Sequence, residues 1–289
     1  APHQAKKADH TARIGQAAAE GRKLRLRIEG RFGVPVSDLD ADPVPVFAAP
    51  QDSPNTPPLT AVKLGEAAAV VTRADLVESL TPVVAGLDPD LLFAPLGCYE
   101  LARVTLPRGF GVWGPTWLLF GDKSTMSPVQ DSRPVIVSET DLVDADRDIF
   151  WHTHIEGSLG RFAIYEEGRL AALATVDDKG DPVREIGMDV APYARGRGLG
   201  RAVVGAAADW ILQNDKVVMA SVGSFNVPSA RTLRSVGLRY LLNDLRSVEG
   251  PFRVPPQPLG RPYSEAPVYD YYPRWAMNQD IQPREVASP

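Results

Sequence analysis

Cysteine is nearly absent from this chain, since Cys98 is the only one among 289 residues. A single cysteine excludes an internal disulfide and a zinc site built from cysteines. It favours residence in the cytoplasm, and residues 1–29 agree, because they lack the apolar stretch typical of a secretory signal. Cys98 lies in the apolar run 91–101, so we expect a buried and unreactive thiol.

Long apolar runs and a strong basic charge are missing as well. No run reaches the ~18 apolar residues typical of a transmembrane helix, so no contact with a membrane is predicted. The net charge of −5 offers no basic field for nucleic acid. We interpret the lysines and arginines within 6–27 as a solvated helix face, with a binding arm as the alternative. Hydrophobic residues make up 44% of the chain, which suits a globular protein with a core.

The sequence pattern divides the chain into a polar lead-in and two α/β segments. Residues 1–30 form the lead-in, 31–133 form a unit of unknown role, and 134–289 form a second domain. Six prolines within 43–58 predict a loop or linker that holds neither a strand pairing nor a helix. The end of the second domain, 251–289, is a tail rich in proline and tyrosine, of which we expect 268–275 to dock on the body.

Hydrophobic periodicity predicts the elements of each segment. In the first we expect a strand at 67–72, helices at 75–84 and 88–104, the latter crossed by Pro95, and paired strands over 110–120. In the second, Val135 opens a strand and Ser138 caps a helix that continues through 139–151. The remaining prediction is a hairpin of 161–165 and 170–176, strands at 184–190, 217–222 and 238–242, and helices at 200–215 and from Asn226 to Gly237.

A glycine-rich run joins the strand 184–190 to the helix that follows it. Here the glycines allow a tight turn, successive N–H groups converge, and the helix dipole adds positive charge. Such a loop is suited to bind a pyrophosphate, although a solvated turn without a ligand is the alternative. A P-loop would need Gly-Lys-Ser/Thr, and a dinucleotide fingerprint would need glycine where Arg201 stands. The run reads Arg195-Gly196-Arg197-Gly198-Leu199-Gly200.

Two motifs together resemble those of the GNAT superfamily of acyl-CoA-dependent N-acyltransferases, over about residues 134–248. Arg195, Gly198 and Gly200 fill the superfamily's pattern Gln/Arg-x-x-Gly-x-Gly/Ala. The second motif is Asn226-x-x-Ser229-Ala230-Arg231, which ends at Val236-Gly237-Leu238. The resemblance implies the GNAT fold, a mixed and mostly antiparallel sheet flanked by helices. The smaller α/β unit before it is either unrelated or a degenerate GNAT half, because tandem members exist.

The resemblance also implies an activity: transfer of an acyl group, acetyl above all, from CoA to a small-molecule or peptide amine, without a metal. Acetyl-CoA would be the co-substrate, and its pantetheine arm would enter where the strand before the loop diverges from the strand after the helix. Alternatives are a longer acyl chain, or a CoA-binding module without catalysis. The residues expected to bind the cofactor are Met188, Asp189, Val190, Arg195, Gly196, Arg197, Gly198, Leu199, Gly200, Asn226, Ser229 and Arg231.

Candidate catalytic residues follow from the same resemblance. Glu185 stands where superfamily members carry a glutamate base, although it could be a surface carboxylate. Leu233 replaces the usual tyrosine acid, so Ser229 is the candidate acid, or else a hydroxyl that bonds to the helix backbone. His152 and His154 are expected to contact the acceptor or to pack at the surface. At i and i+2 on a helix their rings would point apart, which opposes a metal site.

Overall fold

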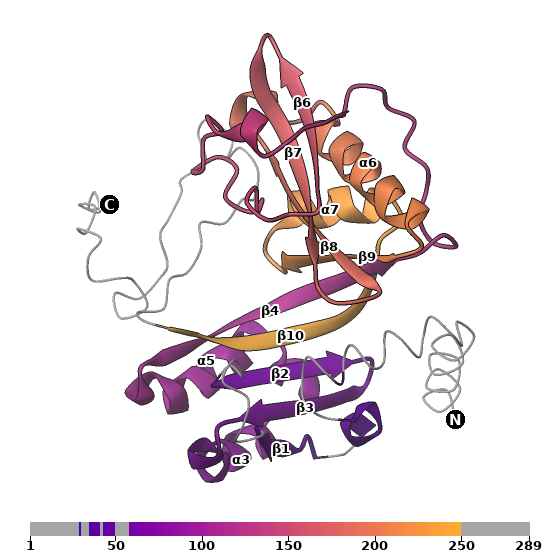
Figure 1. Ribbon diagram of the computed structural model, residues 1–289. Helices are drawn as coiled ribbons and strands as arrows, with labels where there is room; N and C mark the ends of the chain where they lie inside the picture. The colour runs from indigo at the N-terminus through magenta and orange to yellow at the C-terminus, as the bar shows by residue number, and fades with distance from the viewer. Residues whose placement is uncertain (1–28, 30–34, 41–42, 50–57, 250–289) are drawn as a thin grey trace, which may run out of the picture. The chain divides into compact units, whose positions relative to one another are not determined.

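The computed structural model describes residues 29, 35–40, 43–49 and 58–249 (Figure 1). Most of the predicted lead-in and the whole tail, including the expected docking of 268–275, lie outside these residues. The described residues form two compact units: one comprises those up to Thr116 with 223–226 and those from Leu242, the other 117–222 and 227–241. This division differs from the sequence boundary at 133/134, because strands β4 and β10 each pass from one unit into the other.

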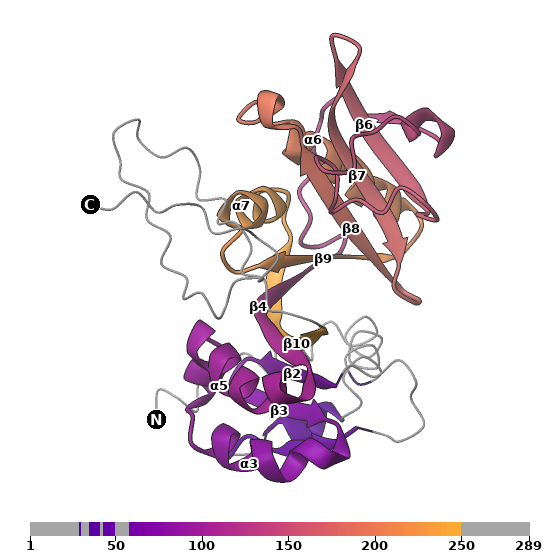
Figure 2. The same cartoon turned by 90° about the vertical axis from the view of Figure 1, so that its left-hand side faces the viewer.

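The first unit combines a mixed sheet with helices. Its strands follow the order β1-β3-β2-β10-β4, and β3 spans the residues predicted for it. Figure 2 shows helices α3 and α5 beside the strands β2 and β3, and α3 packs against both β1 and α5. The elements are the 3₁₀ turns Val36–Asp40, Ala74–Leu76 and Leu106–Arg108, β1 (Val46–Ala48), β2 (Leu59–Leu64), β3 (Ala67–Thr72), α3 (Val77–Ala85), α4 (Pro89–Leu92), α5 (Pro95–Thr105), β4 (Phe110–Gly121) and β10 (Arg239–Glu249).

The proline-rich segment contains a strand, so the prediction that it holds no strand pairing was wrong for Val46–Ala48. Strand β1 pairs in parallel with β3 at the edge of the sheet. The carbonyl of Pro45 accepts from the Val70 N–H at 2.9 Å, and Ala49 N–H donates to Thr72 at 2.7 Å. An edge strand needs donors on one side only, so prolines are tolerated there.

Two further predictions fail at a proline or a glycine. The expected helix 88–104 is two helices, because Pro95 forces Ala94 into an extended conformation (φ −106°, ψ 172°) and so ends α4. The expected paired strands over 110–120 are the single strand β4. Gly114 makes no turn there. A Cβ at this position would lie 2.9 Å from the Asp244 carbonyl oxygen, so the glycine permits the close passage of β10.

The second unit carries the glycine-rich run. Its strands follow the order β9-β8-β7-β6-β5, with antiparallel pairing from β5 to β8 and parallel pairing of β8 with β9. Helix α6 packs against β6, β7, β8 and α7, as the predicted β-β-β-α-β-α-β order requires. The elements are β5 (Val135–Ile136), β6 (Gly160–Glu166), β7 (Arg169–Asp178), β8 (Val183–Val190), the 3₁₀ turns Thr140–Leu142 and Pro192–Ala194, α6 (Leu199–Gln213), β9 (Val217–Gly223) and α7 (Val227–Ser235).

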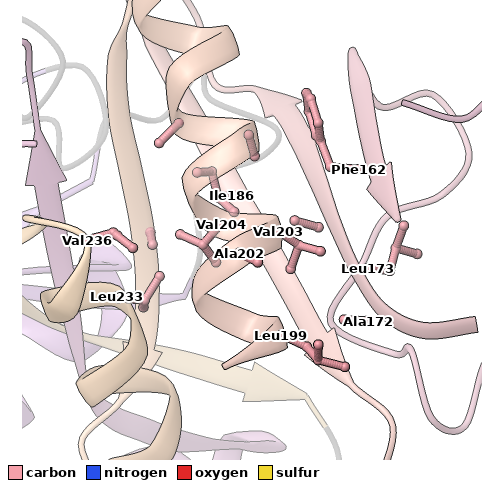
Figure 3. Close-up of a cluster of buried hydrophobic side chains, with 14 of the residues drawn as sticks. Phe162, Ala172, Leu173, Ile186, Leu199, Ala202, Val203, Val204, Leu233 and Val236 are labelled. Carbon is pink, nitrogen blue, oxygen red and sulfur yellow. The ribbon is translucent and has the colours of Figure 1, made fainter. Parts of the chain in front are cut away.

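Apolar side chains between α6, α7 and the sheet form the core of this unit (Figure 3). Val203 and Val204 of α6 are fully buried, and Leu233 of α7 is 3% exposed. The predicted hairpin is confirmed, with Glu167 (φ +51°) and Gly168 (φ +75°) in its two-residue turn. None of the helices in the described part of the chain is both long and apolar enough to cross a lipid bilayer.

The predicted helix through 139–151 does not form, and this prediction was wrong. Ser138 does cap a turn, since its hydroxyl accepts from the Asp141 N–H at 3.3 Å and its own N–H donates to the Asp141 carboxylate at 2.7 Å. The turn stops after Leu142, however, and the chain continues in turns. Aspartates explain this outcome, because their carboxylates bond to nearby backbone N–H groups and compete with helix formation. Asp146, for example, accepts from the Asp148 N–H at 3.0 Å.

Candidate functional site

Strands β8 and β9 diverge shortly after they pair. Their register contains three pairs, from Val183 with Val217 to Glu185 with Met219, and the two strands share no further pair over the rest of their length. Figure 1 shows the two strands separating beyond this point. Residues 186–190 of β8 stay paired with β7 on the other side. The backbone of β8 that faces the gap is therefore available to a ligand that enters as an extended chain.

The glycine-rich loop at the end of β8 is bare on its outer side. Gly196 (φ +79°) and Gly198 (φ +76°) adopt a conformation that L side chains rarely take, and a Cβ at either would meet no atom within 4 Å. The first backbone hydrogen bond of α6 joins the Ala202 N–H to the Gly198 carbonyl at 3.1 Å. The N–H groups of the first turn are thus open at the positive end of the helix dipole. This geometry fits a pyrophosphate.

The arginines of the loop are exposed but differ in their partners. Arg195 donates through Nε to the Val190 carbonyl at 3.3 Å. Arg197 donates to the carbonyls of Ala194 and Tyr193, and its guanidinium forms an ion pair with Glu166 of β6 at 2.7 Å. Arg231, the third predicted cation, is exposed on α7. The positive charge of Arg197 is therefore compensated by the Glu166 carboxylate in this structure.

Helices α6 and α7 place the other predicted cofactor contacts. Met188 and Val190 lie over the first turn of α6, where a Cβ on Gly200 would come within 3.5 Å of one and 3.3 Å of the other. Asn226 immediately precedes α7, and Ser229 lies in its first turn. Leu233 is buried in the core (Figure 3), so the position of the usual tyrosine acid contributes no proton donor.

The opposite face of β8 carries polar groups. Glu185, Gly187 and Asp189 share this face, as alternation predicts. Glu185 is engaged at both oxygens: the Ser221 hydroxyl donates to Oε1 at 2.6 Å, and Lys179 Nζ lies 3.1 Å from Oε2. Glu185, the base predicted from the sequence, is thus bound to one hydroxyl and one cation.

His152 is bound to Asp189 by two hydrogen bonds. Its backbone N–H donates to Oδ2 at 2.8 Å, and its Nδ1 lies 2.7 Å from Oδ1. The imidazole also lies against the indole of Trp151, with ring centroids 3.5 Å apart. The histidines do not stand on a helix as the sequence suggested, because the segment around them consists of turns.

His154 forms the second histidine–carboxylate pair. Its Nδ1 bonds to Asp177 of β7, and its backbone N–H donates to the Thr175 hydroxyl at 3.2 Å. Lys179 Nζ lies 3.8 Å from the Asp177 carboxylate and so joins this pair to Glu185. The His154 side chain is 65% exposed, against 40% for His152.

The network around the two histidines and Glu185 includes residues to which the sequence analysis gave no role. They are Thr175, Asp177, Lys179 and Ser221. The one local signal was the spacing of His152 and His154, which stand two residues apart, as on one face of extended chain. In the part of the chain that the structure describes, no three His, Cys, Asp or Glu side chains form a group that could hold a metal. Cys98 is buried as expected, and burial raises its pKa to about 12, which keeps the thiol protonated at neutral pH.

Comparisons with known proteins give one family match and several similar structures. Residues 128–238 match the family model described as the acetyltransferase (GNAT) family. Similar solved structures include a GCN5-related N-acetyltransferase from Kribbella flavida (18% identity, 52% of this chain and 64% of that one, TM-score 0.39). A GNAT-family acetyltransferase from Colwellia psychrerythraea shares 15% identity over 50% and 59% of the two chains, with a TM-score of 0.40. This chain thus spans less than two thirds of either structure. No curated protein matches it.

Proposed function

Because this chain belongs to the acetyltransferase (GNAT) superfamily through residues 128–238, we propose that it transfers an acetyl group from acetyl-CoA to an amine. The observation that carries the proposal is the divergence of β8 from β9 directly beside the bare glycine loop. A small-molecule or peptide amine as acceptor, and residence in the cytoplasm, belong to the same proposal.

The residues present fit the CoA part of the co-substrate. The N–H groups of 198–201 would hold the pyrophosphate, and Arg195 would supply positive charge beside them. The pantetheine arm would pair with the open side of β8, next to Met188 and Val190. A backbone N–H near Asp189 would then support the negative charge that develops on the thioester oxygen.

Chemistry at this site would be direct attack by the amine, without an acyl-enzyme. Cys98 is excluded as a nucleophile, because it is buried and stays protonated. Direct attack requires a general base for the amine and a proton for the departing thiolate. The sequence nominates Glu185 for the first task and Ser229 for the second.

A CoA-binding module without catalysis is the second candidate, and the burial of Leu233 in place of an acidic hydroxyl favours it. Turnover on a panel of amino acids, polyamines, arylalkylamines and peptide N-termini separates the two functions. Comparison of acetyl-CoA with longer acyl-CoAs on the same panel determines the acyl chain.

Ligand-induced stabilisation tests the cofactor directly. Acetyl-CoA at 100 times its Kd should stabilise the folded protein by about 2.7 kcal/mol, which corresponds to a rise in Tm of about 5–10 °C. NADH and ATP should have much smaller effects. Gly198→Asp places a carboxylate where the pyrophosphate would bind and should abolish the rise.

Gly198→Asn is the matched control, because asparagine must adopt the same positive φ as aspartate but carries no charge. It should lower the unliganded Tm as much as the aspartate does, yet retain most of the response to acetyl-CoA. Equal stabilisation by all three ligands, or an unaffected Gly198→Asp variant, would exclude the assignment of CoA to this loop.

A further inference from the structure

The contact between His152 and Asp189 fixes the tautomer of the imidazole. A carboxylate only accepts hydrogen bonds, so Nδ1, which lies 2.7 Å from Oδ1, must carry the proton. In the neutral ring Nε2 is then the acceptor. Among the described residues it has no hydrogen-bond partner. His152 therefore presents a free proton acceptor in a defined orientation, which is the arrangement that a general base requires.

The backbone of this segment is anchored on both sides of His152. Phe150 and Ile155 are buried in the core, and the buried Thr153 hydroxyl donates to the Phe150 carbonyl at 2.7 Å. The His152 carbonyl lies so close to β8 that a Cβ on Gly187 would come within 2.4 Å of it. Such anchoring holds the ring in place before any substrate binds.

Asp189 connects this ring to the expected position of the thioester. It is the second-last residue of β8, shortly before the glycine-rich loop. Its neighbours Met188 and Val190 point their side chains towards α6. The carboxylate faces the other way and holds His152. The imidazole therefore lies on the face opposite α6, beside the stretch of β8 that would polarise the thioester.

Glu185 is less suited to the role of base. Both of its oxygens are already engaged, one by Ser221 and the other by Lys179. It also lies four residues before Asp189, at the last pair that joins β8 to β9, where the gap only begins. Its contacts are those of a residue that fixes the start of the gap.

We propose that His152 is the general base of the acyl transfer and that Asp189 positions it. This inference rests on the proposed function. Nε2 of His152 takes one proton from the ammonium nitrogen of the acceptor. The freed electron pair forms the C–N bond, the C–S bond breaks, and its electrons go to sulfur. A second nitrogen proton passes to the thiolate, and the proton on Nε2 goes to solvent. The amide, free CoA and one proton are the products.

Several charged groups lie on the same side of the sheet as His152 and can influence the pH dependence of the reaction. Asp189 and Glu185 come from β8, Asp177 from β7, Lys179 from the turn between them, and His154 from the same segment as His152. Of these charged groups, Asp189 is the one that contacts the His152 ring, and its charge compensates the positive charge of the protonated imidazole.

Variants at the two histidines test the base. His152→Gln should lower kcat about 10²–10⁴-fold and remove the acid limb of the kcat/KM profile, since that limb reports protonation of the base in the free enzyme. Asp189→Asn should do the same, because an amide that donates to Nδ1 moves the ring proton to Nε2. The matched variants His154→Gln, Asp177→Asn and Glu185→Gln should keep the limb, whatever their effect on KM.

Chemical rescue separates catalysis from structure. Added imidazole should restore activity to His152→Ala but not to His154→Ala. The assay follows release of the CoA thiol with the amine panel, or slow hydrolysis of acetyl-CoA, while the rise in Tm with acetyl-CoA confirms folding and binding. A retained acid limb in His152→Gln, or its loss in Glu185→Gln, overturns the assignment of the base alone. If the wild-type protein binds acetyl-CoA yet turns over nothing, the proposed enzyme fails together with its base.

Discussion

The two faces of strand β8 are built differently. Towards α6, Met188 and Val190 lie over the first turn of a regular helix, close to Gly200. On the other face, Asp189 and Gly187 meet an irregular segment that is held by side-chain hydrogen bonds. The strand's alternation thus separates two tasks. One face would bind the cofactor through backbone and packing, and the other would present the groups that move protons.

The close approach of the His152 segment to the polar face of β8 requires a glycine at position 187. A Cβ added at Gly187 would lie 2.4 Å from the His152 carbonyl oxygen and 3.3 Å from the Thr175 hydroxyl oxygen. On the α6 face, Gly200 is also close to its neighbours, but all contacts of its Cβ position are with side-chain atoms at 3.3 Å or more. A methyl group should therefore be tolerated at Gly200 and not at Gly187.

Of the substitutions that compare the two faces, Gly187→Ala should cause the largest loss of activity. The methyl group must displace the backbone of His152 and so break its geometry with Asp189. We expect a loss in kcat of about 10²-fold or more, as for loss of a general base, and a loss of about 1–3 kcal/mol of stability from overpacking. Thiol release measures the first effect and urea unfolding the second.

Gly200→Ala is the matched control on the α6 face. It should weaken binding of acetyl-CoA through contact with Met188 and Val190, while the pH profile of kcat stays that of the wild type. If both substitutions changed the pH profile alike, the two faces would not be functionally separate.

Ser229→Ala should have a smaller effect, confined to departure of the thiolate. If the hydroxyl protonates sulfur, kcat should fall about tenfold or more, and the loss should shrink for acyl donors with a more acidic thiol. Ser235→Ala is the control in the same helix, because Ser235 only donates to the Thr232 carbonyl at 2.7 Å. A loss of about 1 kcal/mol of stability in Ser229→Ala, with no dependence on the leaving group, would assign the serine to the helix alone.

The sequence predicted the α6 face better than the polar face, and periodicity explains the difference. Helix α6, the β6–β7 hairpin and the loop at Gly198 each follow a local pattern of apolar spacing or glycine. The polar face is made by residues far apart in sequence, such as His152 with Asp189, from a segment with no period. Local patterns do not encode such pairs.

Prolines and aspartates caused the remaining errors. Pro45 was interpreted as a breaker, yet an edge strand uses only its carbonyl. The helix expected from Ser138 ended after one turn, because side chains such as that of Asp146 bond to the backbone. In both places tertiary contacts and side-chain hydrogen bonds outweighed the local tendency.

The smallest expected effect concerns the ion pair between Arg197 and Glu166. The pair joins the cofactor loop to β6 at 2.7 Å, so Glu166 competes with a pyrophosphate for the guanidinium. A partly exposed surface ion pair of this kind contributes about 0–1 kcal/mol, so Glu166→Gln should tighten binding of acetyl-CoA by at most about fivefold, as titration calorimetry would measure. Glu167→Gln removes the same charge from the adjoining turn residue and should leave the Kd nearly unchanged. An equal gain in both variants would indicate a general charge effect, which added salt would screen. No gain in Glu166→Gln would mean that Arg197 does not bind the cofactor, leaving Arg195 as the cation of the loop.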